Sequence, residues 1–100
     1  MSNTNEFSNK VAIITGSGQG MGKAVAQRLC KGGASVIIND LNESSADQTA
    51  KTLNENGFNA LAIQGDVTSA QDVNRMIETT VKSYGEIHIL VNNAGALRPT

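Results

Sequence analysis

The chain has 100 residues and a formal net charge of −1, with 39% hydrophobic and 17% charged residues. This composition is typical of one small globular domain, and it offers no basic surface for nucleic acid. No apolar run approaches the roughly 20 residues of a membrane span, and the polar start of the chain lacks the apolar core of a signal peptide.

Residues 1–9 are polar, and we expect them to form a flexible leader to a single folded unit over residues 10–100. The single cysteine, Cys30, excludes an intrachain disulfide and is typical of a reducing compartment, which favours the cytoplasm. Cys30 lies in a helical pattern and His88 is the only histidine, so we interpret the thiol as a core or near-surface group.

The first elements are a strand, a helix and a second strand. Val11–Thr15 is a short apolar run that predicts a strand buried on both faces. Apolar or small residues at helical spacing follow, namely Gly22, Val25, Ala26 and Leu29. The glycines in Lys31–Ala34 predict the end of this helix, and Ser35–Asp40 predicts the next buried strand.

The same alternation continues to the fourth strand. Ala46, Ala50 and Leu53 mark a second helix that ends near residues 56–57, and Ala60–Gln64 predicts a third strand. Thr68 or Ser69 would cap the third helix, with Gln71 or Asp72 at the spacing of a capping box. The predicted buried stripe of that helix consists of Val73, Met76, Ile77, Thr80, Val81 and Tyr84. Gly85 would end the helix before a strand at Ile87–Val91.

Strands and helices that alternate in this way predict an α/β fold, a doubly wound parallel sheet of the Rossmann type with helices on both faces. We expect the strand order 3-2-1-4, with the sheet truncated after the fourth strand. Strand 4 would then be an exposed parallel edge, which favours aggregation of these 100 residues alone.

Four glycines alternate with other residues between Gly16 and Gly22, where the first strand meets the first helix. Their spacing excludes a Walker loop, because Ser17 and Ala24 occupy positions that such a loop requires to be Gly and Ser or Thr. It also excludes the common G-x-G-x-x-G fingerprint, whose last glycine would fall on Met21 or Lys23. The pattern that fits is T-G-x-x-x-G-x-G, and glycines there allow a phosphate to approach the helix N-terminus.

Acidic residues follow the second and third predicted strands. Asp40 ends the second strand, 18 positions after Gly22, which places its carboxylate beside the glycine loop. A carboxylate there is able to accept both hydroxyls of an adenosine ribose. Asp66 closes the third strand, where it could accept the exocyclic amine of an adenine while Val67 packs on the ring. Three strand ends would therefore converge on one crevice.

Four motifs resemble those of the short-chain dehydrogenase/reductase family, in the group often called classical: TGSGQGMG at 15–22, NDL at 39–41, GDV at 65–67 and NNAG at 92–95. The resemblance implies an NAD(P)-dependent oxidoreductase that acts on a small alcohol or carbonyl compound, and a homo-oligomer, dimer or tetramer, for the complete protein. It implies that the cofactor-binding residues are Gly16, Ser17, Gln19, Gly20, Met21, Asp40, Leu41, Asp66, Val67, Asn93, Ala94 and Gly95.

Cofactor choice has a separate physical basis at Asp40. A 2′-phosphate carries about −1.5 to −2 charges near neutral pH, and a carboxylate at close range would repel it. NADP-preferring members of the family place a basic residue just before the second loop glycine or just after strand 2. Gln19 and Leu41 occupy these positions here, so we expect NAD as the cofactor.

The family's catalytic residues are not found within these 100 residues. The resemblance implies an Asn, a Ser and a Tyr-x-x-x-Lys pair, but Tyr84 is the only tyrosine and His88 stands where the lysine would fall. We therefore assign no catalytic and no metal-binding residues. We expect residues 10–100 to be the N-terminal NAD-binding part of a Rossmann domain, inactive without the remainder.

Two other functions are compatible with parts of the pattern. Gly16, Gly18 and Gly20 also satisfy the G-x-G-x-G loop of methyltransferases that use S-adenosylmethionine. That reading lacks an acidic residue before the loop, where Thr15 stands, and it does not explain NNAG. A non-enzymatic nucleotide-binding protein is the third hypothesis, because the chemistry of the family lies outside these residues.

Overall fold

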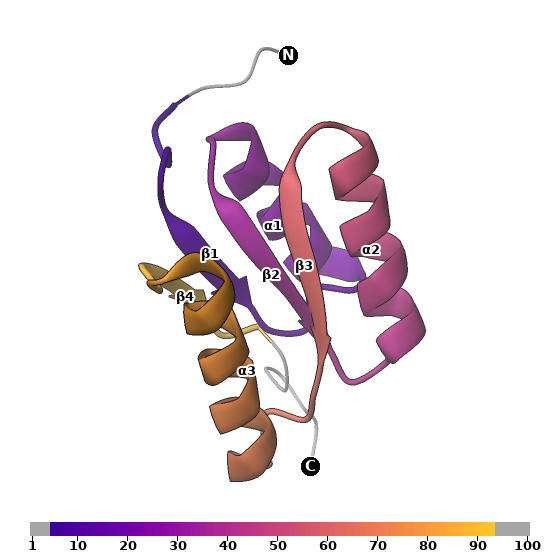
Figure 1. The fold of residues 1–100 in the computed structure, drawn as a ribbon. Helices are drawn as coiled ribbons and strands as arrows, with labels where there is room; N and C mark the ends of the chain where they lie inside the picture. Colours follow the sequence, from indigo (N-terminus) through magenta and orange to yellow (C-terminus); the bar gives the residue numbers. More distant parts are fainter. Residues whose placement is uncertain (1–4, 94–100) are drawn as a thin grey trace.

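The computed structural model describes residues 5–93, which form a parallel sheet flanked by helices (Figure 1). The strands are β1 (Val11–Ile14), β2 (Ser35–Asp40), β3 (Asn59–Gln64) and β4 (Ile89–Val91). The helices are α1 (Gly20–Lys31), α2 (Glu43–Glu55) and α3 (Ala70–Tyr84). No helix in this part of the chain is long and apolar enough to cross a membrane.

The sheet has the order β3-β2-β1-β4, which confirms the predicted topology. All pairs are parallel, with Val11 opposite Ser35 between β1 and β2, and Ala12 opposite Ile89 between β1 and β4. Every strand therefore ends at the same edge of the sheet. The chain first builds outward from β1 to β2 and β3 and then returns to the other side of β1 with β4, so a ligand crevice is expected at the ends of these strands.

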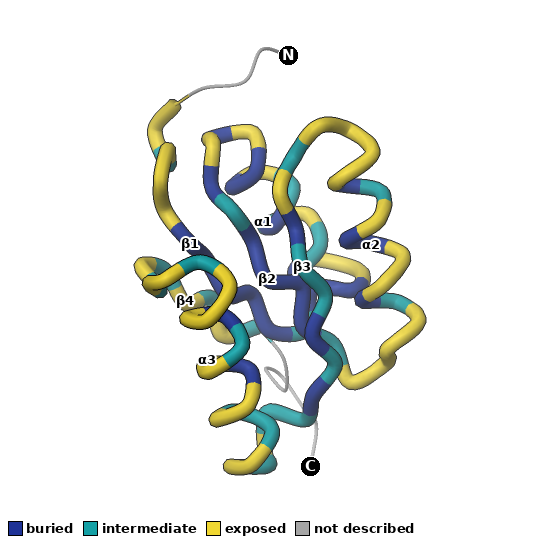
Figure 2. The backbone as a smooth tube through the Cα atoms, in the orientation of Figure 1, coloured by how far each residue is buried: buried dark blue, intermediate teal, exposed yellow. Residues whose placement is uncertain are grey.

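Helices α1 and α2 lie on one face of the sheet and α3 on the other (Figure 1), and the central strands are buried (Figure 2). A hydrophobic cluster fills each side. Alternate residues of β1 point to opposite faces: Ile14 packs with the layer of α1 and α2, whereas Ile13 packs with Met76 of α3. The strands β1 and β2 are buried along almost their whole length, as short apolar runs in a doubly covered parallel sheet should be.

The predicted buried stripe of α3 is wrong at two positions. Met76 and Thr80 are buried, but Ile77 is 42% exposed and Val81 is 44% exposed. The helix contacts the sheet along only one side of its apolar face, and Ile77 borders an open apolar hollow of about 260 Å³ together with Leu90 of β4. Periodicity identifies an apolar face of a helix, but it does not say how much of that face other elements cover.

β4 begins later than predicted, and Asp66 lies farther from the end of β3 than predicted. β4 begins at Ile89 instead of Ile87, because the His88 side chain takes part in the pairing: Nδ1 accepts the Val11 N–H at 2.9 Å, while the His88 N–H donates to the Val11 carbonyl. β3 ends at Gln64, so Asp66 lies two residues beyond the strand and not at its last position.

The described part of the N-terminal segment makes tertiary contacts that its polar sequence did not predict. The Phe7 N–H donates to the Gly32 carbonyl at 2.7 Å, and the Phe7 ring packs against the core at the end of α1. Arg28 of α1 lies over this ring and forms an ion pair with Glu6.

Burial of Cys30 generates a prediction about alkaline stability. Burial raises the pKa of the Cys30 thiol to about 11 from its ordinary value of 9.0. Because the folded state holds this proton more tightly than the unfolded state, stability is retained below pH 9 and falls as the pH rises from 9 to 11, by about 2–3 kcal/mol in total. Unfolding by urea at several pH values measures this fall.

The Cys30→Ala variant is the control for that experiment, because other groups also titrate in this range. It should show a shallower loss of stability between pH 9 and 11 than the wild-type chain. Equal slopes for the two proteins would show that the thiol does not contribute.

Candidate functional site

The loop between β1 and α1 has backbone conformations that require glycine. Gly16 and Gly20 both have a φ of 63°, in the left-handed region that L side chains rarely adopt. A Cβ at Gly20 would meet nothing within 4 Å, so the position that a side chain would occupy is open space. Gly22 is buried, and a Cβ there would collide with the Gly16 carbonyl and lie 2.8 Å from Nδ2 of Asn93. The spacing therefore serves both a tight turn and close packing.

Ser17 fixes the beginning of this loop to β2. Its N–H donates to the Asn39 carbonyl at 2.8 Å, and its Oγ accepts the Asn39 N–H at 3.1 Å while donating to the Ile14 carbonyl at 2.6 Å. The side chains of Ser17 and Asn39 are both buried. Ser17 consequently acts through the backbone and does not present its hydroxyl to a ligand.

Asp40 at the end of β2 points toward the glycine loop. Its Oδ2 accepts the Gly18 N–H at 3.0 Å, and its Oδ1 accepts the Asn42 N–H at 3.1 Å. Each carboxylate oxygen has a second acceptor site, so the group is able to accept ligand hydroxyls as well. A Cβ at Gly18 would lie 2.8 Å from Oδ2 of Asp40, which shows why this position is glycine. Gly18 was not among the predicted site residues, although its place in the alternating glycines was the available signal.

The N-terminus of α1 differs from those of α2 and α3. Asn42 caps α2 by accepting the Ser45 N–H, and Ser69 caps α3 by accepting the Asp72 N–H. Gln19 at the N-cap of α1 makes no such side-chain hydrogen bond, and the first turn of α1 has no acidic residue. The first-turn N–H groups of a helix lack partners within the helix, so this end retains its affinity for an anion.

The end of β4 is tied to the same loop by its asparagines. The Asn93 N–H donates to Oγ1 of Thr15 at 2.9 Å, and Nδ2 of Asn93 donates to the Gly16 carbonyl at 3.2 Å. Oγ1 of Thr15 donates to Oδ1 of Asn92 at 3.3 Å. These contacts hold β4 against the start of the glycine loop. Two further predicted site residues, Ala94 and Gly95, lie outside the described residues.

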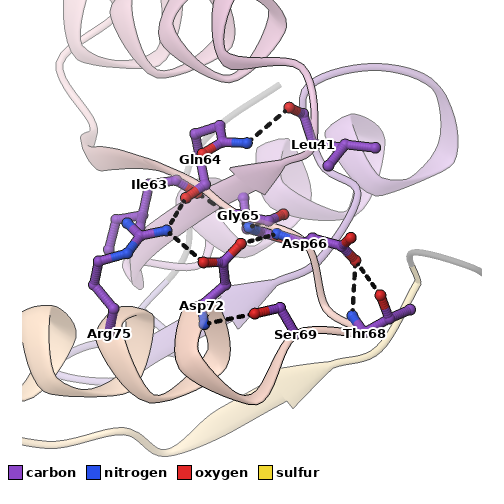
Figure 3. A network of polar contacts seen from close by, with 10 residues as sticks. Leu41, Ile63, Gln64, Gly65, Asp66, Thr68, Ser69, Asp72 and Arg75 are labelled. Atoms are coloured by element: carbon purple, nitrogen blue, oxygen red, sulfur yellow. Dashed lines mark hydrogen bonds and ion pairs between the residues drawn. The ribbon is translucent and has the colours of Figure 1, made fainter.

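Asp66 lies in the turn between β3 and α3 (Figure 3). Its Oδ1 accepts both the N–H and the hydroxyl of Thr68, at 2.8 and 2.6 Å. The Asp66 N–H in turn donates to Oδ2 of Asp72 at 2.9 Å. The carboxylate therefore shapes its own turn in addition to any contact with a ligand.

The first turns of α3 anchor this segment to the end of β3 (Figure 3). Arg75 donates from Nη2 to the Gln64 carbonyl at 2.8 Å and lies 3.5 Å from the Asp72 carboxylate. Nε2 of Gln64 donates to the Leu41 carbonyl at 3.1 Å, which links the ends of β2 and β3. Val67, which follows β3, borders the apolar hollow that Thr15 and Asn92 also line. The chain after β3 therefore reaches the ends of β1 and β4.

Tyr84 and His88 both lie at the opposite edge of the sheet from this site. The Tyr84 hydroxyl is 3.0 Å from Oδ1 of Asn59, the first residue of β3, and His88 contacts Val11, the first residue of β1. Burial raises the pKa of the Tyr84 hydroxyl, whereas a general acid/base needs a pKa near the working pH. Neither residue is placed to react with a ligand at the carboxyl edge. The described residues also contain no cluster of His, Cys, Asp or Glu that could hold a metal ion.

Together these features define a class of protein, the doubly wound α/β proteins of the Rossmann type. A glycine loop leads from β1 into an open helix N-terminus, and a carboxylate at the end of β2 contacts that loop.

Comparison with known proteins identifies the family. The sequence model described as short chain dehydrogenase matches residues 10–100. Short-chain dehydrogenase/reductase homolog YusS of Bacillus subtilis is 43% identical over 91 residues, which cover 90% of this chain and 84% of that protein. The crystal structure of a hydroxysteroid dehydrogenase from Escherichia coli superposes with a TM-score of 0.90 at 36% identity, covering 95% of this chain and 40% of that one. The chain belongs to the short-chain dehydrogenase family.

Relatives of very different lengths match this chain. Diacetyl reductase [(S)-acetoin forming] of Staphylococcus epidermidis is 37% identical over 87 residues, 87% of this chain but 34% of the reductase. The chain therefore spans about a third of the length of that enzyme and most of the length of YusS. The resemblance to classical short-chain dehydrogenases, limited to their N-terminal portion, is confirmed.

The packing of Gly22 generates a stability prediction. Gly22→Ala should lower the free energy of unfolding by about 1–3 kcal/mol, because the added methyl group collides with the backbone of Gly16. This sign is opposite to the gain of about 1 kcal/mol that alanine gives over glycine in an unhindered helix. Urea unfolding followed by circular dichroism measures the change.

Gly65→Ala is the matched control for a buried glycine. An added Cβ there would be in ordinary contact, 3.4 Å from Nη2 of Arg75, and Gly65 has no positive φ. It should change the free energy of unfolding by less than about 0.5 kcal/mol. A Gly22→Ala variant as stable as the wild type would contradict the close packing of loop and helix.

Proposed function

We propose that this chain forms the NAD-binding part of a short-chain dehydrogenase/reductase that transfers hydride between NAD(H) and an alcohol or carbonyl substrate. The observation that carries this proposal is the placement of the Asp40 carboxylate on the Gly18 N–H, beside the uncapped N-terminus of α1. An acceptor for ribose hydroxyls and a donor set for a diphosphate are thereby adjacent. Family membership supports the same assignment.

Each cofactor group would meet a different strand end. The main-chain amides of residues 19–21 would hold the diphosphate, and Asp40 with Leu41 the adenosine ribose. Asp66 and Val67 would border the adenine, and Asn93 with residues 94–95 the second ribose. Gly16 and Gly20 would keep the backbone open to the diphosphate. When bound, NAD supplies the hydride acceptor, and the residues of this chain orient it.

NAD is the preferred cofactor in this proposal because Asp40 is negatively charged. A 2′-phosphate on the ribose would lie beside this carboxylate, and neither Gln19 nor Leu41 offers a compensating cation. The names of two relatives, a diacetyl reductase and a hydroxysteroid dehydrogenase, include one carbonyl compound and one alcohol. A homo-oligomer and a cytoplasmic location remain our predictions.

The 100 residues by themselves should bind NADH without catalysing hydride transfer. They contain no Tyr-x-x-x-Lys pair, and Tyr84 lies at the wrong edge of the sheet.

Replacement of Asp40 tests the cofactor preference. The Asp40→Asn variant keeps a carbonyl oxygen that is able to accept the Gly18 N–H, but it loses the charge. We expect the ratio of NADPH to NADH dissociation constants to fall about tenfold, because repulsion of the 2′-phosphate is removed. Fluorescence titration with both nucleotides measures the ratio, and an unchanged ratio would refute the assigned role of Asp40.

Replacement of Gly20 tests where the diphosphate lies. Gly20→Ala places a methyl group in the open space at the start of α1, and we expect it to weaken NADH binding at least about tenfold. Gly57→Ala is a matched control, because Gly57 also has a positive φ, of 87°, and open space for a Cβ, but lies in the turn after α2. Both variants should lose about 1–2 kcal/mol of stability from backbone strain.

Only Gly20→Ala should lose NADH affinity. Equal affinities in the two variants would place the diphosphate elsewhere.

Titration with S-adenosylmethionine tests the methyltransferase hypothesis, since our proposal predicts no saturable binding of that compound.

A further inference from the structure

We infer that Thr49 of α2 is a positioning residue for the diphosphate-binding loop, an inference that rests on the proposed function. Thr49 lies 31 residues along the chain from Gly18, and its hydroxyl donates to the Gly18 carbonyl at 2.7 Å. Thr49 is 2% exposed, so this bond is shielded from water. No sequence motif of the site includes this residue.

The geometry of the peptide bond gives this contact its effect on a ligand. In a planar trans peptide, the carbonyl of one residue and the N–H of the next point in opposite directions. The described residues have no cis peptide bond. Thr49 holds the Gly18 carbonyl toward α2, and the Gln19 N–H of the same peptide is therefore directed away from α2. Gln19 is exposed and is the N-cap of α1, so this N–H joins the donors at the open helix end.

The Gly16–Ser17 peptide, earlier in the same loop, follows the same rule, and both of its ends have partners. The Gly16 carbonyl accepts from Nδ2 of Asn93, and the Ser17 N–H of that peptide donates to the Asn39 carbonyl on the other side. The loop thus has two peptides whose orientation is set from their carbonyl ends by side chains of other elements. The N–H of the Gly16–Ser17 peptide is used within the fold. The N–H of the Gly18–Gln19 peptide is turned toward the region where the diphosphate is proposed to bind.

Rigid orientation of Gly18 also needs the opposite contact, from Asp40 to the Gly18 N–H. Gly18 is therefore held at both ends, by a carboxylate from β2 and by a hydroxyl from α2. Without Thr49, the Gly18–Gln19 peptide would be free to rotate about its flanking bonds, and glycine offers little resistance to such rotation. Donors that are fixed in advance bind a ligand more tightly than donors that must be ordered on binding.

The experiment compares ADP with adenosine, because only ADP carries the diphosphate. Dissociation constants are measured by amide chemical-shift titration for the wild-type chain and for Thr49→Val, Thr49→Ser and Thr80→Val. Thr49→Val preserves the shape of the side chain and removes the donor, while Thr49→Ser retains the donor. Thr80→Val is the matched control: Thr80 is also buried and also donates at 2.7 Å, but to the Met76 carbonyl within α3.

We expect Thr49→Val to weaken ADP binding about tenfold and to leave adenosine binding within about twofold of the wild type. Thr49→Ser and Thr80→Val should retain the wild-type affinity for both ligands. A merely structural role for Thr49 would lower both affinities together or leave both unchanged, and either result would overturn the inference. If the wild-type chain binds neither ADP nor adenosine, the proposed function itself is refuted. If the wild-type chain binds ADP and Thr49→Val binds it equally well, only the role of Thr49 is refuted.

If Thr49→Val does not fold, the response of the Gln19 amide to ADP in the wild-type chain decides the question, with Thr49→Ser as the control that keeps the donor. A serine hydroxyl that makes the same bond should leave the chemical-shift response of this amide to ADP unchanged. A Gln19 amide that does not respond to ADP in the wild-type chain would contradict the inference directly.

Discussion

The hydrogen bond between the Gly18 N–H and the Asp40 carboxylate joins the two strand ends on which the proposed site depends. It brings a negative charge against a loop that leads into the positive end of α1. The contact is possible only because Gly18 has no Cβ, which would lie 2.8 Å from the same carboxylate oxygen. One missing side chain therefore allows the proposed ribose acceptor to lie against the loop that carries the proposed diphosphate donors.

The glycine loop is held by hydrogen bonds to β2, to α2 and to the residues that follow β4. Ser17 binds β2, Thr49 of α2 binds the Gly18 carbonyl, and Asn93 after β4 binds the Gly16 carbonyl. Such support is needed because glycine is costly to order. The parallel sheet supplies these anchors at one edge, since all four strands end there.

The positions of the strands and helices follow from local sequence, because buried parallel strands and glycine turns have strong local signals. The strand order and the common edge of the strand ends follow from the topology of doubly wound sheets. The capping-box spacing predicted Thr68 or Ser69 as the cap of α3, and the cap is Ser69. The exposure of Ile77 and Val81 was not, because an apolar face shows what could be covered and not what covers it. The contact of Thr49 with Gly18 was equally invisible, since a threonine in a helix carries no signal of a partner 31 residues away.

The account makes one central claim, that the glycine loop of this chain holds the diphosphate of NADH. The most direct test is a map of amide chemical shifts across the chain during titration with NADH. The account predicts that the largest saturable changes fall on residues 18–22 and on Asp40 and Leu41. Changes confined to the apolar hollow beside Ile77 and Leu90, or no saturable change at all, would contradict it.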